Sequence, residues 1–239
     1  MGTSVVLLAY KEAENLKIML PRLGDIFRDM GIDYEIIVVD SAAPLDNTEE
    51  ICSSFGVRYI PQEEPYYGGA FRTGIKYARY ERIQVLDADC SHDPVVIPSI
   101  HSKFDEGYDL VIGSRYVKGG VSNDSKSSFV MSKILNTTMR ICIGVKARDI
   151  STSYRLYDAG LLKAVTLKRN NYDVLQEVIL KMKICKRKEK KRLEIGEVPI
   201  VFNKRAFGES KRHLFKFICG YVASLFILIG MNLKSKFAG

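Results

Sequence analysis

Two aspartates separated by one residue are the strongest chemical signal in the sequence. Asp87, Ala88 and Asp89 directly follow the β-favouring run Ile83-Gln84-Val85-Leu86. Where a chain turns at the end of a strand, carboxylates at this spacing can project toward one point and hold a hard divalent cation together with diphosphate oxygens. An Asp-x-Asp triplet is also common in solvated turns. Its place after a buried strand is what favours metal binding.

Polar residues follow two other strand-like runs in the same way. Asp40 ends the run Glu35–Val39, where its carboxylate could accept hydrogen bonds from a base or a ribose hydroxyl. Tyr10 and Glu12 follow the run Val5–Ala9. Each carboxylate also has a purely structural alternative, because Asp40 could cap a helix and Glu12 could complement a helix dipole.

Small residues open the third helix-like segment. Gly68, Gly69 and Ala70, followed by Gly74, lack the Gly-x-Gly-x-x-Gly order of a dinucleotide-binding loop. Small residues at a helix start let backbone amides approach a phosphate or a sugar. Close packing of the helix on a sheet is an equally good explanation.

An alternation of strands and helices is predicted to position these residues. The strand-like runs are Val5–Ala9, Glu35–Val39, Val57–Ile60, Arg82–Leu86 and Leu110–Ile112. Helical patterns lie between them, near Glu12–Met30, Asn47–Phe55, Ala70–Arg79 and Val95–Glu106. This order predicts an α/β fold with a mostly parallel central sheet, helices on both faces, and ligands beyond the carboxyl ends of the strands.

The order loosens after residue 120. Met131–Ile143, Tyr157–Leu167 and Val174–Lys183 have helical patterns, and Arg192–Phe202 returns to a strand pattern. Lys181–Arg192 holds eight basic residues in twelve. That run could face anionic lipid headgroups or simply solvent.

Composition places the chain among globular proteins with an anionic partner. Its 239 residues are 46% hydrophobic and 27% charged, with a formal net charge of +8. Nucleic acid, a nucleotide-sugar and anionic lipid would all suit that charge. The five cysteines show no Cys-x-x-Cys spacing, so we expect reduced thiols in a cytosol-facing protein. No secretory signal is evident at the start.

Eight segments spread over roughly residues 4 to 212 follow one another as in a known family. They are Ala9–Leu16, Val38–Asp40, Pro44 with Asp46 and Thr48, Gly68–Ala78, Leu86–His92, Asp109–Gly120, Arg148–Arg155 and Glu197–Lys211. In these segments the chain resembles inverting glycosyltransferases of the GT-A type, and among them it is most similar to dolichyl-phosphate mannose synthases.

On the donor side, the resemblance implies a nucleotide-sugar pocket with a metal ion. Asp89 would be the principal ligand of Mg²⁺ or Mn²⁺, and Asp87 would hold the metal and the nucleotide side. The residues implied to bind the nucleotide-sugar are Tyr10, Glu12, Asp40, Asp87, Ala88 and Lys211.

On the acceptor side, the resemblance implies a polyprenyl phosphate met by Arg115, with help from Ser132. Arg205 and Lys211 would lie over the donor diphosphate. Displacing a nucleoside diphosphate builds negative charge on the leaving group, which a cation and Arg or Lys stabilise. Since the acceptor phosphate is already an anion, no general base is needed. We therefore interpret all three histidines, His92, His101 and His213, as incidental.

Several positions depart from the family's pattern. Ser41 stands where relatives carry a second Asp, which leaves open the base that the pocket accepts. Ser91 replaces a further metal-side group, and Ser128 replaces a common basic residue. The pair Ser153-Tyr154 takes the place of a Gly-Phe pair that is usual in the family. The segment Tyr172–Glu177 matches only approximately, and we expect its Glu177 to help shape the site.

The C-terminal segment predicts contact with a membrane. Phe217–Leu233 carries no charge and, as a helix, would be about 26 Å long, just short of a hydrocarbon core of about 30 Å. We expect a catalytic domain over 1–212, facing the cytoplasm, and a membrane-associated hydrophobic helix over 213–239. A spanning anchor, an interfacial helix and a buried core helix are all open.

The favoured function is transfer of a hexose to a polyprenyl phosphate with inversion. Mannose from GDP-mannose is the first choice and glucose from UDP-glucose the second. A sugar transfer to a hydroxyl acceptor would need a carboxylate base and would leave Arg115 without a role. A non-catalytic sugar-nucleotide-binding subunit is a third hypothesis. Nucleic-acid binding is not expected, because no recognition motif appears.

Overall fold

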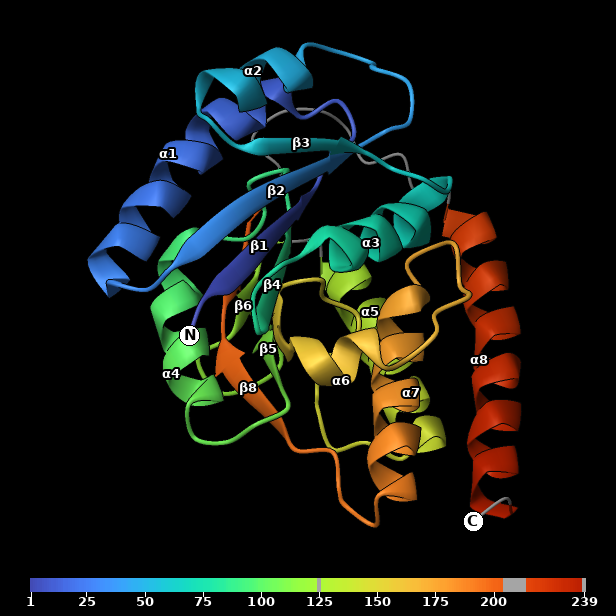
Figure 1. Cartoon of the computed structure of the whole chain (residues 1–239). Helices are drawn as coiled ribbons and strands as arrows, with labels where there is room; N and C mark the ends of the chain where they lie inside the picture. The colour runs from blue at the N-terminus through green and yellow to red at the C-terminus, as the bar shows by residue number, and fades with distance from the viewer. Residues whose placement is uncertain (124–125, 204–213, 238–239) are drawn as a thin grey trace.

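A seven-stranded sheet forms the centre of the molecule (Figure 1), in a computed structural model that describes residues 1–123, 126–203 and 214–237. The strand order is β3-β2-β1-β4-β7-β5-β8. The strands are β1 (Thr3–Leu8), β2 (Tyr34–Asp40), β3 (Arg58–Pro61), β4 (Arg82–Asp87), β5 (Leu110–Ser114), β7 (Arg155–Asp158) and β8 (Ile195–Pro199). Only β7 runs antiparallel to its neighbours. The predicted mostly parallel sheet is confirmed.

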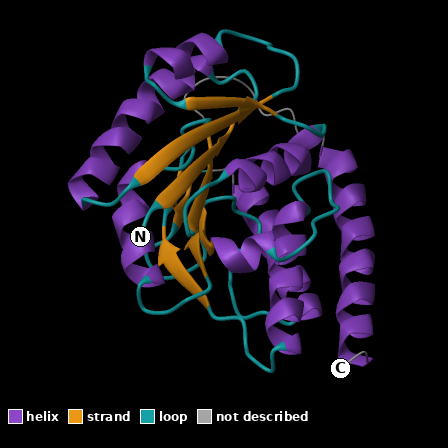
Figure 2. Cartoon of the chain, in the orientation of Figure 1, coloured by secondary structure: helices purple, strands orange, loops and turns teal. Residues whose placement is uncertain are grey.

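Helices cover both faces of this sheet (Figure 2). Packed with one face are α1 (Ala13–Met30), α2 (Thr48–Ser54), the 3₁₀ helix η1 (Pro94–Val96) and α4 (Ile97–Phe104). Packed with the other are α3 (Tyr66–Tyr77), α5 (Lys126–Ile143), α6 (Ala159–Lys163), α7 (Val174–Lys188) and α8 (Leu214–Phe237). In the part of the chain that the structure describes, no helix combines the length and the apolar character needed to cross a membrane.

Strand β1 shows why two cores form. Val5 and Leu7 point into the core shared with α1, α2 and α4, whereas Val6 and Leu8 point into the core shared with α3 and α7. Successive side chains of a strand face opposite sides of the sheet, so a strand covered on both sides is apolar throughout.

Two sequence-based expectations for the second half are corrected. Tyr157–Leu167 is not one helix, because Arg155–Asp158 forms β7 and only Ala159–Lys163 is helical. Leu156 and Tyr157 are both buried, one in each core, as an inserted central strand requires. The expected strand Arg192–Phe202 is divided at Ile200 into β8 and β9 (Val201–Phe202), which pairs with β6 (Val121–Ser122).

Gly74 lets α3 lie directly on the sheet. A methyl group at this position would overlap with Cγ1 of Val6. We expect Gly74→Ala to lower the free energy of unfolding by about 1–3 kcal/mol, as overpacking does. Gly24→Ala is the matched control, because its added methyl meets only the Tyr34 hydroxyl at 3.7 Å. That change should stabilise α1 by up to about 1 kcal/mol. Urea denaturation measures both, and equal shifts would contradict the packing argument.

His101 is a second testable feature of the core. It is 3% exposed and lies edge-on to Phe27, and neither ring nitrogen has a hydrogen-bond partner within the described residues. Burial, helped by Arg82, lowers the pKa of His101 to about 4 from an ordinary 6.5. The unfolded chain therefore binds the proton first on acidification. The stability that His101 contributes is complete above about pH 6.5 and is lost progressively toward about pH 4.

Replacing His101 should accordingly flatten the pH dependence of stability. Between pH 7 and pH 5 the native protein should lose on the order of 2 kcal/mol through this group. His101→Leu should remove that part of the loss, which urea denaturation at the two pH values would detect. An unchanged difference between pH 7 and pH 5 in the variant would contradict the assignment.

Candidate active site

Asp87 and Asp89 lie at the carboxyl end of β4, where β4 pairs with β1. The N–H of Ala88 donates to the Leu8 carbonyl at 3.2 Å, which fixes the triplet beside the end of the neighbouring strand. Tyr67 donates its hydroxyl to Asp87 Oδ1 at 3.1 Å, and the N–H of Ser91 donates to Asp89 Oδ1 at 3.0 Å. Asp87 is half-buried and Asp89 is 5% exposed. Two carboxylates are thus held at one strand end.

Asp40 ends β2, the neighbour of β1 on its other side. Its carboxylate is buried and accepts hydrogen bonds from the Tyr59 and Ser41 hydroxyls, each at 3.4 Å. Burial raises the pKa of Asp40, and the nearby Asp46 adds to the effect. The helix-capping role proposed as an alternative for Asp40 falls instead to Asp46, which accepts the N–H groups of Ala13 and Thr48 at 3.1 Å.

Tyr10 and Glu12 lie between β1 and α1. Tyr10 is 51% exposed. Glu12 stands at the N-cap position of α1 and accepts a hydrogen bond from Asn15 Nδ2 at 2.5 Å. Because β2, β1 and β4 are adjacent and parallel, the structure brings Tyr10, Glu12, Asp40 and the Asp87–Asp89 triplet to one edge of the sheet. With Ala88 between the two aspartates, these are the residues expected to bind the nucleotide-sugar, apart from Lys211.

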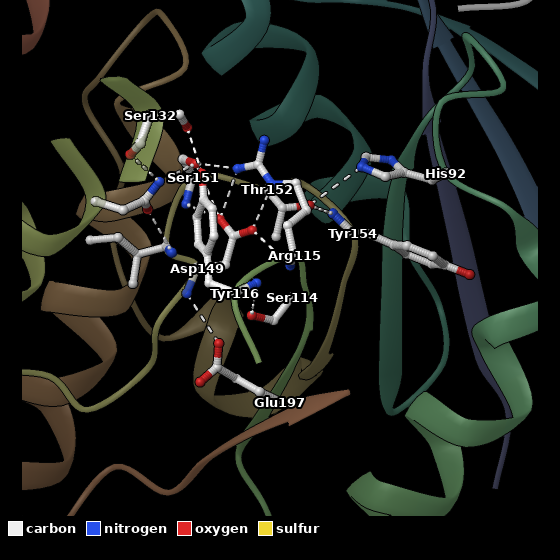
Figure 3. Close-up of polar contacts among 12 residues, drawn as sticks. His92, Ser114, Arg115, Tyr116, Ser132, Asp149, Ser151, Thr152, Tyr154 and Glu197 are labelled. Atoms are coloured by element: carbon white, nitrogen blue, oxygen red, sulfur yellow. Dashed lines mark hydrogen bonds and ion pairs between the residues drawn. The ribbon is translucent and has the colours of Figure 1, made fainter. Parts of the chain in front are cut away.

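Arg115 follows β5 and is fixed by a buried carboxylate (Figure 3). Its Nε donates to Asp149 Oδ2 at 2.7 Å and its Nη2 to Asp149 Oδ1 at 3.0 Å. Nη2 also donates to the Ser151 hydroxyl at 2.8 Å. Burial raises the pKa of Asp149, but the Arg115 guanidinium outweighs this effect and holds the pKa below its usual value. Such a two-point contact fixes the plane of the guanidinium.

Ser132 belongs to the same polar network as Arg115. Tyr116, the residue after Arg115, donates its hydroxyl to Ser132 Oγ at 2.9 Å. Asn136, one turn further along α5, donates from Nδ2 to the Ser132 carbonyl at 3.0 Å and to the Ser151 hydroxyl at 2.8 Å. The structure thus joins the two residues expected to meet an acceptor phosphate. Asp149, Ser151 and Asn136 were not singled out from the sequence, although Asp149 and Ser151 lie in the matching segment Arg148–Arg155.

His92 connects the two halves of the site, so the interpretation of this residue as incidental is incomplete. Its buried ring packs on Tyr154 and Phe202, and its Nε2 lies 3.3 Å from the Thr152 hydroxyl. Phe202 also lies under the Arg115 guanidinium, 5.3 Å from ring centroid to Cζ. The turn after Asp89 is thereby packed against the acceptor-side residues.

The Gly68–Gly69 pair serves packing. The Gly68 N–H donates to the Asn170 carbonyl at 2.7 Å, and a methyl group at Gly68 would overlap with the Arg169 carbonyl. This amide is therefore used within the protein, and the phosphate-binding alternative is wrong for Gly68. At Gly69 a methyl group would overlap with the Glu64 carbonyl.

Glu177 of α7 holds the loop around Arg169 and Asn170, on which Gly68 packs. Its buried carboxylate accepts the N–H groups of Lys168 and Arg169 at 2.8–3.0 Å. After this loop, Tyr172 stacks on Tyr67, the residue that donates to Asp87. Glu177 can therefore help to shape the site, as expected, through the loop, Tyr172 and Tyr67.

Some expected residues cannot be placed. Arg205 and Lys211 lie outside the described residues, and so does the side chain of Ser128. The Ser41 hydroxyl donates to the Ala43 carbonyl at 2.9 Å, and Ser91 is buried.

The expected metal ligands are the two carboxylates Asp87 and Asp89. Within the described ranges, no group of three or more His, Cys, Asp or Glu side chains is arranged to hold a metal ion. Asp87 and Asp89 offer hard oxygen donors, as Mg²⁺ and Mn²⁺ prefer. They suit a cation that takes its remaining ligands from a bound diphosphate.

Two solved structures of sugar phosphoglycerate synthases share the fold of this chain. The chain matches glucosyl-3-phosphoglycerate synthase from Mycobacterium tuberculosis, solved with Mn²⁺, uridine-diphosphate-glucose and phosphoglyceric acid, with a TM-score of 0.73 and 17% identity over 96% of this chain and 80% of that one. It also matches mannosyl-3-phosphoglycerate synthase from Rubrobacter xylanophilus, with a TM-score of 0.73 and 16% identity over 99% and 75%. The predicted GT-A fold is confirmed.

Sequence comparison gives the family. Residues 4–166 match the model of glycosyl transferase family 2, and the chain belongs to this family. It is 34% identical to a dolichol-phosphate mannosyltransferase of Pyrococcus furiosus over 88% of its own length, and it spans 59% of that longer protein. It is 29% identical to a polyprenol monophosphomannose synthase of Mycolicibacterium smegmatis, over 87% of this chain and 80% of that protein.

Proposed function

We propose that the chain transfers mannose from GDP-mannose to the phosphate of a polyprenyl phosphate, with inversion at the anomeric carbon. The observation that carries this proposal is Arg115, held by Asp149 and Ser151 and joined to Ser132 at one end of the sheet. The names of the two sequence relatives, a dolichol-phosphate mannosyltransferase and a polyprenol monophosphomannose synthase, support both the sugar and the acceptor.

The electrostatics of this region favour a phosphate acceptor over a hydroxyl acceptor. A hydroxyl nucleophile needs a carboxylate base. The carboxylate beside Arg115 is Asp149, which is 0% exposed and is hydrogen-bonded by the guanidinium on both oxygens. Its pKa is lowered, despite the opposing effect of burial, so it is a weak base. A phosphate acceptor needs no base and gains from a fixed guanidinium.

On the donor side, Asp87 and Asp89 would hold Mg²⁺ or Mn²⁺ against the diphosphate. The bound cation would stabilise the charge that develops on the leaving nucleoside diphosphate. Tyr10, Glu12 and Asp40, at the same sheet edge, would bind the nucleotide. Arg205 and Lys211 are proposed to add positive charge over the diphosphate.

The donor and acceptor can be tested together. Purified protein in detergent is incubated with polyprenyl phosphate, Mg²⁺ or Mn²⁺, and GDP-mannose, UDP-glucose or UDP-N-acetylglucosamine in separate samples. Mass spectrometry should find a mannosyl lipid from GDP-mannose that disappears with EDTA. Product from UDP-glucose alone would overturn the choice of sugar. Absence of lipid product from every donor would overturn the proposed function.

We further propose that this activity takes place at a membrane, with the catalytic domain facing the cytoplasm. Helices α5 and α8 pack against each other and expose large apolar side chains. These are Val130, Met131, Ile134 and Ile141 on α5, and Phe226, Ile227 and Leu233 on α8. A lipid acceptor must reach the site from a bilayer, and exposed apolar side chains on two adjoining helices suit that contact.

Charging this surface should weaken membrane binding. The double variant Ile134→Asp, Phe226→Asp should bind anionic vesicles at least about tenfold less tightly in co-sedimentation, because two apolar contacts with the lipid are lost. Val95→Asp is the control, since Val95 is 63% exposed on η1, at the other face of the sheet. Equal vesicle binding by the native protein and the double variant would contradict the assignment.

A further inference from the structure

The loop 148–151, between α5 and β7, carries two side chains that accept hydrogen bonds from Arg115. It supplies the Asp149 carboxylate and the Ser151 hydroxyl to the guanidinium. Both Asp149 and Ile150 are 0% exposed. A buried loop must find partners for its backbone N–H and C=O groups. Here those partners are side chains from four other elements.

Asn136 is the partner that connects this loop to α5. Its Oδ1 accepts the Ile150 N–H at 2.9 Å, and its Nδ2 donates to the Ser151 hydroxyl at 2.8 Å. The same Nδ2 donates to the Ser132 carbonyl at 3.0 Å, one turn earlier in the helix. The side chain is 3% exposed, and both of its polar atoms are hydrogen-bonded. Ser132 and the loop that holds Arg115 are therefore fixed to one amide group.

Three further side chains hold the loop from the sheet and from α7. Glu197 of β8, drawn in Figure 3, accepts the Asp149 N–H at 3.0 Å. It also accepts the Arg148 N–H at 2.9 Å. The Ile150 carbonyl accepts Arg155 Nη2 at 2.8 Å and Gln176 Nε2 at 3.0 Å. These partners fix the backbone, but in the part of the chain that the structure describes none of the three also has a hydrogen bond to α5.

We propose that Asn136 is a positioning residue, which sets the Arg115 guanidinium and the Ser132 hydroxyl in one geometry toward the acceptor phosphate. The inference rests on the proposed function, because that function assigns both groups to the acceptor. The described donor-side residues lie at the ends of β1, β2 and β4, and Asn136 has no hydrogen bond to any of them. Its loss should therefore change the use of the acceptor and leave donor binding intact.

The test compares Asn136→Ala with Asn232→Ala. Asn232 is the same residue type, is 4% exposed, and donates Nδ2 to the Cys142 carbonyl of α5 at 3.1 Å, but among the described residues it has no hydrogen bond to loop 148–151. Asn136→Ala should lower kcat/KM for polyprenyl phosphate by about 10–100-fold, since small displacements of positioned groups are costly. The KM for GDP-mannose should stay within about twofold of the native value. Asn232→Ala should leave both parameters near native.

A second readout separates this inference from the proposed function. In ¹⁵N spectra of arginine-labelled protein, the Nε–H of Arg115, identified by its loss in Arg115→Lys, should be protected from solvent exchange by Asp149. Asn136→Ala should speed that exchange at least about tenfold, because the loop gains freedom, and Asn232→Ala should not. Unchanged Nε–H exchange in Asn136→Ala would overturn the inference, even if no donor gave product. Native activity with equal kinetic effects of both Asn variants would also overturn it. A native protein without activity would overturn the proposed function alone.

Discussion

Replacement of Asp89 by Asn should abolish glycolipid synthesis, with kcat lowered by about 10³-fold or more. The two side chains have the same shape, but Asn brings no negative charge and only one oxygen to a cation. Steady-state assays with saturating GDP-mannose and polyprenyl phosphate measure the effect. Raising Mn²⁺ tenfold should restore only part of the activity, because the lost charge acts in the transition state as well as in metal binding.

The fold should survive the Asp89 change. Asp89 Oδ1 accepts the Ser91 N–H, and an amide oxygen can accept the same bond. Asp93→Asn provides a matched control in the same loop, because Asp93 Oδ1 accepts the Val95 N–H at 3.1 Å in the same way. That variant should retain activity within about threefold of native. Near-native kcat in Asp89→Asn, or equal losses in both variants, would contradict the metal-ligand assignment.

Arg115→Lys should produce the second-largest effect, confined to the acceptor. Lysine keeps the charge but cannot form the two-point contact with Asp149 together with the bond to Ser151. We expect kcat/KM for polyprenyl phosphate to fall by about 10²-fold, with the KM for GDP-mannose nearly unchanged. Initial rates at varied acceptor and fixed donor measure the first value, and the reverse experiment measures the second.

Two comparisons make the Arg115 result interpretable. Arg148→Lys changes an exposed arginine next to Asp149 and should have native kinetics. Arg115→Met would leave the buried Asp149 carboxylate without its cation, and should lower the free energy of unfolding by about 3–5 kcal/mol. Native kcat/KM for polyprenyl phosphate in Arg115→Lys would contradict the acceptor role assigned to Arg115. A larger change in the KM for GDP-mannose than in kcat/KM for polyprenyl phosphate would contradict it as well.

Periodicity predicted the first half of the fold because the strands there are buried on both faces and are separated by well-formed helices. It misplaced β7, since a strand of four residues that carries the buried Arg155 has no apolar run to reveal it. It also read Arg192–Phe202 as one strand. In the structure Ile200 lies between β8 and β9, directly after Pro199, and donates its N–H to the Ser114 carbonyl.

The site was predictable where a polar residue ends a buried strand, as with Asp40 and Asp87. Asp149, Asn136 and Glu197 escaped that rule, because they act on backbone groups of a loop or on a side chain far away in the sequence. Those partners become visible only when α5, β5 and β8 are packed together. His92 illustrates the same limit, because Tyr154 and Phe202, distant in sequence, enclose its ring.

The most direct test of the central claim compares two acceptors that differ only in the phosphate. The protein is incubated with radiolabelled GDP-mannose, Mn²⁺, and either a polyprenyl phosphate or the polyprenol of the same chain length. The account predicts labelled lipid from the phosphate, at a rate at least about 10³-fold above that from the alcohol. The proposed role of Arg115 is to stabilise an anionic acceptor, and the carboxylate beside it, Asp149, is paired with the guanidinium on both oxygens. Equal labelling of the two lipids, or labelling of the polyprenol alone, would contradict it.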